Sequence, residues 1–231
     1  MNDELELSII IPAFLEEENL RVLLPRIARA AASLSCSREI LVVDTVQAMD
    51  SSMEVCELHD STYIHREGGN DYGNAVTTGI ARARGRFILF MDADGSHPPE
   101  LIPELFKHRS QYDVVIASRY VEGGFTENNA LLVFMSRVLN VTYRLVLGLK
   151  CKDVSNSFKL YRADPLKQVK LYCRNFDIIE EILFKLNRDF HVRIKEVPAT
   201  FKKRMFGETK RNLFAFMLGY LFTLVRLRFG K

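Results

Sequence analysis

Apolar runs that stop abruptly at polar or proline residues alternate along this chain with segments whose apolar residues recur every three or four positions. The run at 7–11 ends at Pro12, and apolar residues at helical spacing follow over 20–34. Pro25 disturbs this second pattern only locally. A short apolar run followed by a helical pattern indicates the strand and helix of an α/β domain.

The alternation continues along most of the chain. Further strands are expected at 40–43, 62–65, 114–117 and 192–197 and from Phe87 onward, and further helices at 74–84, 101–108, 131–147 and 176–186. We therefore predict an α/β fold, with a doubly wound, mostly parallel sheet covered by helices on both faces. The predicted domain covers residues 1–210, and a C-terminal apolar and basic helix, amphipathic or interfacial, covers 211–231.

The buried run that begins at Phe87 ends in two carboxylates, a glycine and two prolines. In open α/β sheets, ligands bind at the carboxyl ends of the strands. Asp92 and Asp94 can there reach one divalent cation, whose other ligands would be water and diphosphate oxygens. The alternative is that two surface carboxylates merely begin a turn. We interpret them as metal ligands in a nucleotide-sugar site.

Two other strand ends should open into the same crevice. The loop 12–16 follows the first strand and Asp44 ends the second, so both should face the Asp92 loop. Asp44 could accept a hydrogen bond from a nucleobase or ribose, or it could cap the next helix. The glycine-rich segment 68–73 lacks the lysine of a Walker-type ATPase, and the loop 12–16 lacks the glycines and basic residues of a nucleotidyltransferase.

Composition excludes several classes of protein. The chain has 231 residues, 48% of them hydrophobic, and a net charge of +3, which is too small to argue for a nucleic-acid partner. Its 4 cysteines are widely spaced, which suggests reduced thiols rather than a disulfide framework or a zinc site. The acidic start does not resemble a signal peptide, so secretion is not expected.

Six motifs in this order resemble family 2 glycosyltransferases, in particular their dolichol-phosphate mannosyltransferase-like branch. They are Ile-Ile-Ile-Pro-Ala-Phe-Leu-Glu at 9–16, Leu-Val-Val-Asp at 41–44, Gly73 with Ala75 and Gly79, Met-Asp-Ala-Asp-Gly-Ser-His-Pro-Pro at 91–99, Ala-Ser-Arg-Tyr-Val-Glu-Gly-Gly at 117–124 and Arg-Met-Phe-Gly-Glu-Thr-Lys at 204–210. An ordered set is far more specific than any single motif.

The resemblance implies a GT-A fold and a metal-assisted, inverting transfer of mannose or a glucose-like sugar from GDP-mannose or a UDP-sugar to polyprenyl phosphate, with Mg²⁺ or Mn²⁺ as cofactor. Matching positions for the nucleotide sugar are Pro12, Phe14, Glu16, Asp44, Asp92, Ala93, Asp94 and Ser96, with Asp92 and Asp94 on the metal. The catalytic set is Asp94, Arg119, Arg204 and Lys210. A lipid monophosphate is already ionised at neutral pH, so no general base is required.

The chain departs from the family pattern in three places. Thr45 stands where a second aspartate is common, Val133 lies where a basic residue is common, with Arg137 the nearest arginine, and Asn156-Ser157 replaces a Ser-Gly pair. These departures keep a second hypothesis open, a noncatalytic glycosyltransferase-like subunit that scaffolds a membrane complex.

The C-terminal segment bears on location. Residues 213–225 carry no charge, but a helix of this length reaches only about 20 Å, short of a hydrocarbon core of about 30 Å. Basic residues flank it on both sides. We expect a peripheral protein on the cytoplasmic face of a membrane, with the alternative of a core helix or an interface with a second copy or a membrane subunit.

Overall fold

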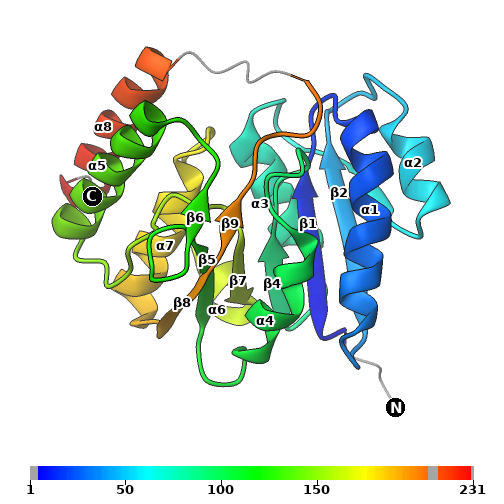
Figure 1. The fold of residues 1–231 in the computed structure, drawn as a ribbon, viewed down its shortest axis with the longest axis horizontal. Helices are drawn as coiled ribbons and strands as arrows, with labels where there is room; N and C mark the ends of the chain where they lie inside the picture. The colour runs from blue at the N-terminus through cyan, green and yellow to red at the C-terminus, as the bar shows by residue number, and fades with distance from the viewer. Residues whose placement is uncertain (1–4, 208–212, 230–231) are drawn as a thin grey trace.

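The computed structural model describes residues 5–207 and 213–229. Within them, seven strands form one sheet in the order β3-β2-β1-β4-β7-β5-β8, and all but β7 run parallel (Figure 1). The strands are β1 (Leu7–Pro12), β2 (Arg38–Asp44), β3 (Thr62–His65), β4 (Phe87–Phe90), β5 (Val114–Ser118), β7 (Lys159–Arg162) and β8 (Ile194–Pro198). Two short strands, β6 (Phe125–Thr126) and β9 (Thr200–Phe201), pair separately.

Helices cover both faces of the sheet, each over its own hydrophobic cluster. One face carries α1 (Glu17–Ala32), α2 (Ser52–Leu58), α4 (Ile102–Lys107) and the short 3-10 turn at Pro99–Leu101; the other carries α3 (Tyr72–Arg82), α5 (Ala130–Leu147), α6 (Ala163–Gln168), α7 (Ile178–Phe190) and α8 (Leu213–Phe229). Alternate residues of β1 enter the two clusters, as a strand buried on both faces requires.

The predicted α/β class and GT-A-like architecture are confirmed. The C-terminal helix is present as α8, and it packs against the body of the protein. Tyr220, Leu224 and Leu227 lie in the core cluster, and the Tyr143 hydroxyl of α5 donates a hydrogen bond to the Tyr220 carbonyl at 2.6 Å. One face of α8 therefore packs in the core, as the alternative of a core helix predicts.

Strand β7 was absent from the sequence-based expectation. Its sequence, Lys-Leu-Tyr-Arg, does not look like a central strand because it carries charge at both ends, yet it lies between β4 and β5 and runs antiparallel to both. Its amino end therefore lies at the carboxyl edge of the parallel strands. The loop 153–158, which leads into β7, is thereby brought to the edge where ligands bind.

Two ionisable side chains are buried together beneath this loop. The Lys159 ammonium donates to the carbonyls of Val154, at 2.9 Å, and Asn156. Burial lowers the pKa of Lys159 to about 8. Burial also raises the pKa of Glu180, on α7, to about 8, and its carboxyl oxygens have no hydrogen-bond partner among the described residues. At neutral pH, Lys159 is therefore charged and Glu180 is mostly protonated.

This arrangement predicts an unusual pH dependence of stability. Because the pKa of Glu180 is about 8 in the folded state against 4.5 for a free carboxyl, the stability that its protonation supplies is lost as pH rises through about 8. Glu180→Gln mimics the protonated form, so its advantage in Tm over the parent should grow from about pH 5 to about pH 8, each kcal/mol adding about 2–4 °C. Thermal unfolding across this range is the measurement, and a pH-independent difference would contradict the assignment.

Candidate active site

The candidate site lies where β1, β2 and β4 end side by side. The loop after β4 carries the two predicted metal ligands. The Asp92 carboxylate accepts hydrogen bonds at Oδ1 from the hydroxyls of Tyr72, at 3.2 Å, and Ser157, at 2.9 Å. Asp94 Oδ1 accepts the Ser96 N–H at 3.0 Å. Both side chains are therefore oriented by the protein while keeping oxygens for a cation.

The donors present fit a hard divalent cation. The Ser96 hydroxyl is buried and has no hydrogen-bond partner among the described residues, so it is an available third oxygen near Asp94. No cluster of three histidine, cysteine or acidic side chains suited to a metal occurs in the described part of the chain. Two carboxylates and a hydroxyl leave positions for water and diphosphate oxygens, which suits Mg²⁺ or Mn²⁺ better than a closed zinc site.

His97 fixes the start of the same loop. Its Nδ1 accepts the Asp92 backbone N–H at 3.0 Å, so the ring proton resides on Nε2, which lies 4.0 Å from Asp92 Oδ2. The ring stacks on Phe158 at 5.0 Å between centroids, with Phe201 at its edge. Burial lowers the pKa of His97 and keeps it neutral.

The segment 202–207 covers the metal loop. The Lys202 N–H donates to the Ser96 carbonyl at 2.9 Å, and the Met205 N–H donates to the Asp94 carbonyl at 3.0 Å. Gly95 has φ +78°, and a Cβ there would lie 2.4 Å from the Met205 side chain. The left-handed backbone favours glycine at position 95, and a larger residue there would also require the Met205 side chain to shift.

Two predicted site residues, Glu16 and Arg204, are in contact where the covering segment reaches the loop 12–16. The Arg204 guanidinium forms an ion pair with the Glu16 carboxylate and donates to the Phe206 carbonyl at 2.8 Å. Asn19 of α1 holds the other Glu16 oxygen at 2.5 Å and accepts the Phe206 N–H at 3.1 Å. These contacts join the 12–16 loop to the covering segment, and Glu16 and Arg204 neutralise each other's charge.

Asp44 lies buried at the end of β2. Its Oδ2 accepts the Tyr63 hydroxyl at 3.1 Å, whereas Oδ1 has no hydrogen-bond partner among the described residues. Burial raises its pKa. The capping alternative is wrong, because α2 begins only at Ser52. The Thr45 hydroxyl donates to the Gln47 carbonyl at 2.5 Å, so it folds back onto its own turn.

Arg119 lies at the end of β5 and is engaged by the loop 153–158. Its Nε and Nη2 donate to the Asp153 carboxylate at 2.8 and 2.6 Å, and Nη2 also donates to the Ser155 hydroxyl at 3.0 Å. Burial disfavours the guanidinium charge, but Asp153 outweighs it and raises the pKa of Arg119. The sequence analysis assigned no contact in the site to Tyr72, His97, Asp153 or Ser157, although His97 and Ser157 lie in segments that it singled out. Their roles depend on contacts between distant segments.

Arg137 is the arginine of α5 that follows Val133 by one helical turn. The two residues are four apart on α5 and so share a helix face. The guanidinium carbons of Arg119 and Arg137 lie 5.1 and 5.6 Å from the centroid of the Tyr120 ring. The Tyr120 hydroxyl donates to the Ser136 hydroxyl at 2.7 Å. Two cations thus gather around one tyrosine beside the metal loop.

A family profile and two relatives of known name match this chain. The profile of glycosyl transferase family 2 matches residues 8–170. The chain belongs to glycosyl transferase family 2. It is 34% identical over 214 residues to a dolichol-phosphate mannosyltransferase of Pyrococcus furiosus and 30% identical over 218 residues to that of Saccharomyces cerevisiae. Both matches cover 89% of this chain, but they span 59% of the first relative and 81% of the second.

Solved structures agree on the fold of this family 2 glycosyltransferase. A glucosyl-3-phosphoglycerate synthase from Mycobacterium tuberculosis, solved with Mn²⁺, UDP and glucosyl-3-phosphoglycerate, superposes with a TM-score of 0.74 at 16% identity, covering 97% of this chain and 80% of the other. The same enzyme was also solved with Mg²⁺ and UDP. At this identity the likeness establishes the fold alone.

The remaining predicted site residues of the glycosyltransferase take varied positions. Pro12 ends β1, Ala93 is buried within the metal loop, and Phe14 is partly exposed at the rim. Lys210 lies outside the described residues. The roles assigned to all of these residues stay predictions.

The hydrogen bond between His97 and the metal loop can be tested with two variants. His97→Asn retains an acceptor near the Nδ1 position, whereas His97→Leu leaves the Asp92 N–H unpaired at a cost of about 1–3 kcal/mol. We therefore expect the leucine variant to be less stable than the asparagine variant by about that amount, although leucine fills more of the space. Urea unfolding measures the difference, and equal stability would show that the hydrogen bond contributes nothing.

Proposed function

We propose that this glycosyltransferase transfers a hexose, mannose or a glucose-like sugar, from a nucleoside-diphosphate sugar to a polyprenyl phosphate with inversion at the anomeric carbon. The observation that carries the proposal is that the protein has both a loop with the oriented carboxylates of Asp92 and Asp94 and a cluster of Arg119 and Arg137 around Tyr120. The names of the two relatives support a dolichol-phosphate type of acceptor.

The donor would be held at the ends of β1, β2 and β4. Asp44 has a buried, unpartnered carboxylate oxygen available for a base or ribose donor group. Asp92, Asp94 and the Ser96 hydroxyl would hold Mg²⁺ or Mn²⁺, which when bound neutralises charge that develops on the departing diphosphate. Arg204 is placed to move from Glu16 to the diphosphate, because both are anions at the same loop.

The acceptor phosphate would bind the arginine cluster. Arg137 has no carboxylate partner among the described residues, and its guanidinium carbon lies 5.6 Å from the centroid of the Tyr120 ring. Arg119 is held by Asp153 and so supplies a rigid charge. A planar fork of donors aligns phosphate oxygens for attack, and an ionised phosphate needs no general base.

The noncatalytic alternative predicts a different outcome. A scaffold would tolerate loss of the metal loop, whereas the Ser96 hydroxyl without a partner and the oriented Asp92 carboxylate indicate that the loop is built to bind. Asp94 has the same chemistry as Asp164, an exposed residue of α6 with no role in the site, which offers a matched control.

Sugar transfer with purified protein tests the function. We expect product with polyprenyl phosphate, none with polyprenol, and a loss of at least about a hundredfold in rate for Asp94→Asn, because one electrostatic partner of the leaving group is worth about 2.7–4 kcal/mol. Asp164→Asn should match the parent. Equal transfer to polyprenol would refute the acceptor assignment, and full activity of Asp94→Asn would refute the metal site.

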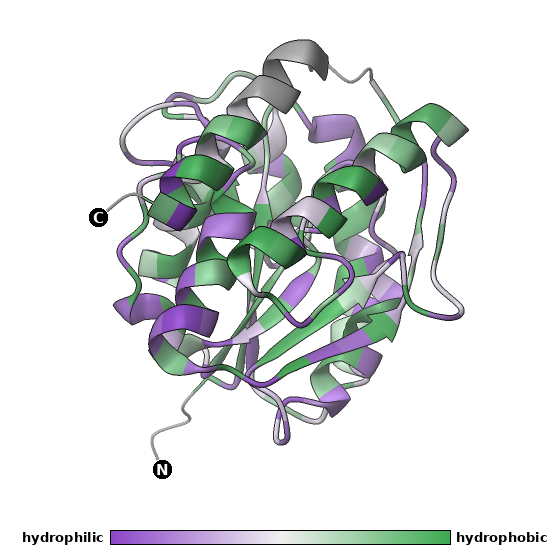
Figure 2. Cartoon of the chain, turned by 90° about the vertical axis from the view of Figure 1, so that its left-hand side faces the viewer, coloured by the Kyte–Doolittle hydropathy of each residue, from purple (hydrophilic) through white to green (hydrophobic). Residues whose placement is uncertain are grey.

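A peripheral position on the cytoplasmic face of a membrane is part of this proposal. Helices α5 and α8 lie side by side, and much of the described part of both is coloured as hydrophobic in Figure 2. Their exposed large apolar residues are Leu131, Phe134, Val138, Val141, Leu145 and Val146 on α5 and, in the described part of α8, Leu221, Phe222, Val225 and Phe229. Free cysteines are consistent with a reducing compartment. The proposed membrane-binding surface therefore includes α5 as well as the C-terminal segment.

Helix α5 is also long and apolar enough to cross a membrane by length and composition, at 18 residues. Its two ends lead to β6 and to the 153–158 loop of the same folded body, and Asn140 in its middle bonds that loop at 2.6 and 3.0 Å. These connections favour a helix that lies along the interface with its apolar face toward lipid.

Vesicle binding tests the location. Replacing Phe134, Val138 and Leu145 by Ser removes three exposed apolar side chains, and we expect binding to anionic vesicles to fall by about tenfold or more, since each buried side chain of this kind contributes about 1.5–3 kcal/mol. Leu58→Ser changes a residue of α2 that is 71% exposed and should have no effect. Co-sedimentation measures binding, and unchanged binding of the triple variant would contradict the proposal.

A further inference from the structure

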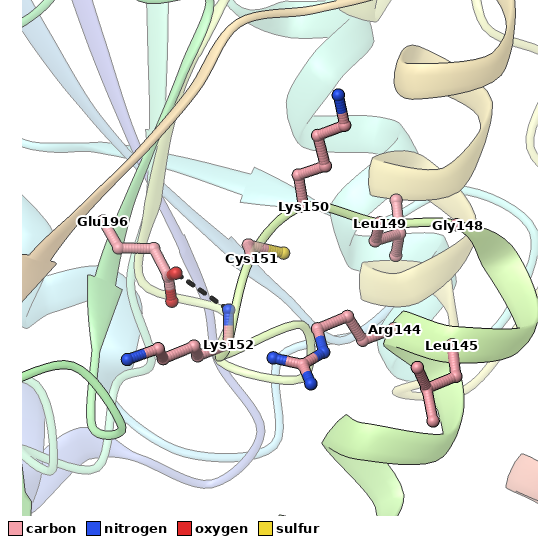
Figure 3. A pocket seen from close by; sticks show the side chains of 8 residues that line it. All are labelled: Arg144, Leu145, Gly148, Leu149, Lys150, Cys151, Lys152 and Glu196. Atoms are coloured by element: carbon pink, nitrogen blue, oxygen red, sulfur yellow. Dashed lines mark hydrogen bonds between the residues drawn. The ribbon is translucent and has the colours of Figure 1, made fainter.

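A cavity of about 430 Å³ opens at the carboxyl end of α5, and no residue of the metal loop 92–96 lines it. Figure 3 shows its lining, in which Arg144 points from the helix toward the loop that carries Lys152, while Lys150 extends away from both. The other lining residues are Leu145, Gly148, Leu149, Cys151 and Glu196. The cavity is large enough for a phosphate and part of the group attached to it.

The cavity carries an excess of positive charge. Arg144, Lys150 and Lys152 form no ion pair among the described residues, and Glu196 is the single carboxylate in the lining. The Glu196 carboxylate is already used, since it accepts the N–H groups of Lys152 at 2.8 Å and Asp153 at 2.9 Å and the Ser118 hydroxyl at 2.7 Å. The lining nevertheless holds three cations against one carboxylate, a net charge of +2, so an anion would meet an excess of positive charge there.

An apolar stripe leads to the cavity. The exposed side chains on α5 at 131, 134, 138, 141 and 145 are three or four residues apart and so follow one face of the helix for about 21 Å. Leu145, which is 70% exposed, ends this stripe and also lines the cavity. A ligand that combines an apolar chain with a phosphate matches both surfaces at once.

We propose that this cavity binds the phosphate of an anionic phospholipid headgroup, with the planar fork of Arg144 and the ammonium of Lys152 as its main ligands. This inference rests on the proposed peripheral location and adds a specific lipid site to it. The site is separate from the arginine cluster of the transfer reaction, because Arg144 is seven residues, about 10 Å, farther along α5 than Arg137. Lipid bound here would hold the carboxyl end of α5 at the surface.

Vesicle binding of the full chain, with a variant that removes the two main cations, tests the site. Arg144→Gln/Lys152→Gln is compared with Arg29→Gln/Lys170→Gln, which removes two exposed cations elsewhere and changes the net charge equally. With vesicles of phosphatidylcholine and phosphatidylglycerol, we expect the first variant to lose about tenfold in affinity and the second to lose little. Arg144→Lys should lose part of the affinity, because it keeps the charge without the fork.

Three results would overturn the proposal. Equal losses in the two double variants would show general attraction to a charged surface. Weaker binding of inorganic phosphate by Arg144→Gln/Lys152→Gln, with unchanged vesicle binding, would assign the cavity to free phosphate. If the parent protein does not bind vesicles, the cavity is not a lipid site. Sugar transfer to a detergent-solubilised acceptor should be unchanged in every variant, so that failure of the catalytic assignment is seen separately.

Discussion

A single buried ammonium group organises the edge of the sheet on which the site is built. Lys159 opens β7 and donates to the carbonyls of Val154 and Asn156, so that the loop 153–158 is held over the sheet. That loop carries Asp153, which orients Arg119, and Ser157, which orients Asp92. Both halves of the proposed reaction centre therefore depend on one segment whose position is set by an interaction in the core.

The loop also joins the reaction centre to the proposed membrane surface. Asn140 of α5 accepts the N–H groups of Val154 and Ser155, and the same helix presents Arg137 toward Tyr120 and its apolar stripe outward. The helix proposed to contact lipid is thus bonded directly to the loop that orients Arg119. Under the proposed function, a lipid-linked acceptor would reach the arginine cluster without leaving the interface, because both surfaces lie on faces of one helix.

On the opposite side, the covering segment 202–207 closes the site. Backbone hydrogen bonds from Lys202 and Met205 reach the metal loop, and Arg204 closes onto Glu16. The closing contacts are an ion pair and a few hydrogen bonds, with little apolar burial apart from Met205 at Gly95. A diphosphate at this edge would compete with Glu16 for the Arg204 guanidinium, and the buried Glu16 carboxylate would then keep only the Asn19 amide as a partner.

The sequence alone determined the strands and helices with clear periodicity, the α/β class, and the position of Asp92 and Asp94 at a strand end, because these follow from local patterns of apolar and polar residues. The tertiary structure decided what local patterns do not contain. It placed β7, with its buried Lys159, in the middle of the sheet, and brought Arg137 to Arg119 across Tyr120. It also joined α5 and α8 into one apolar surface. Each of these depends on contacts between residues distant in the chain, whose energies appear only when the segments meet.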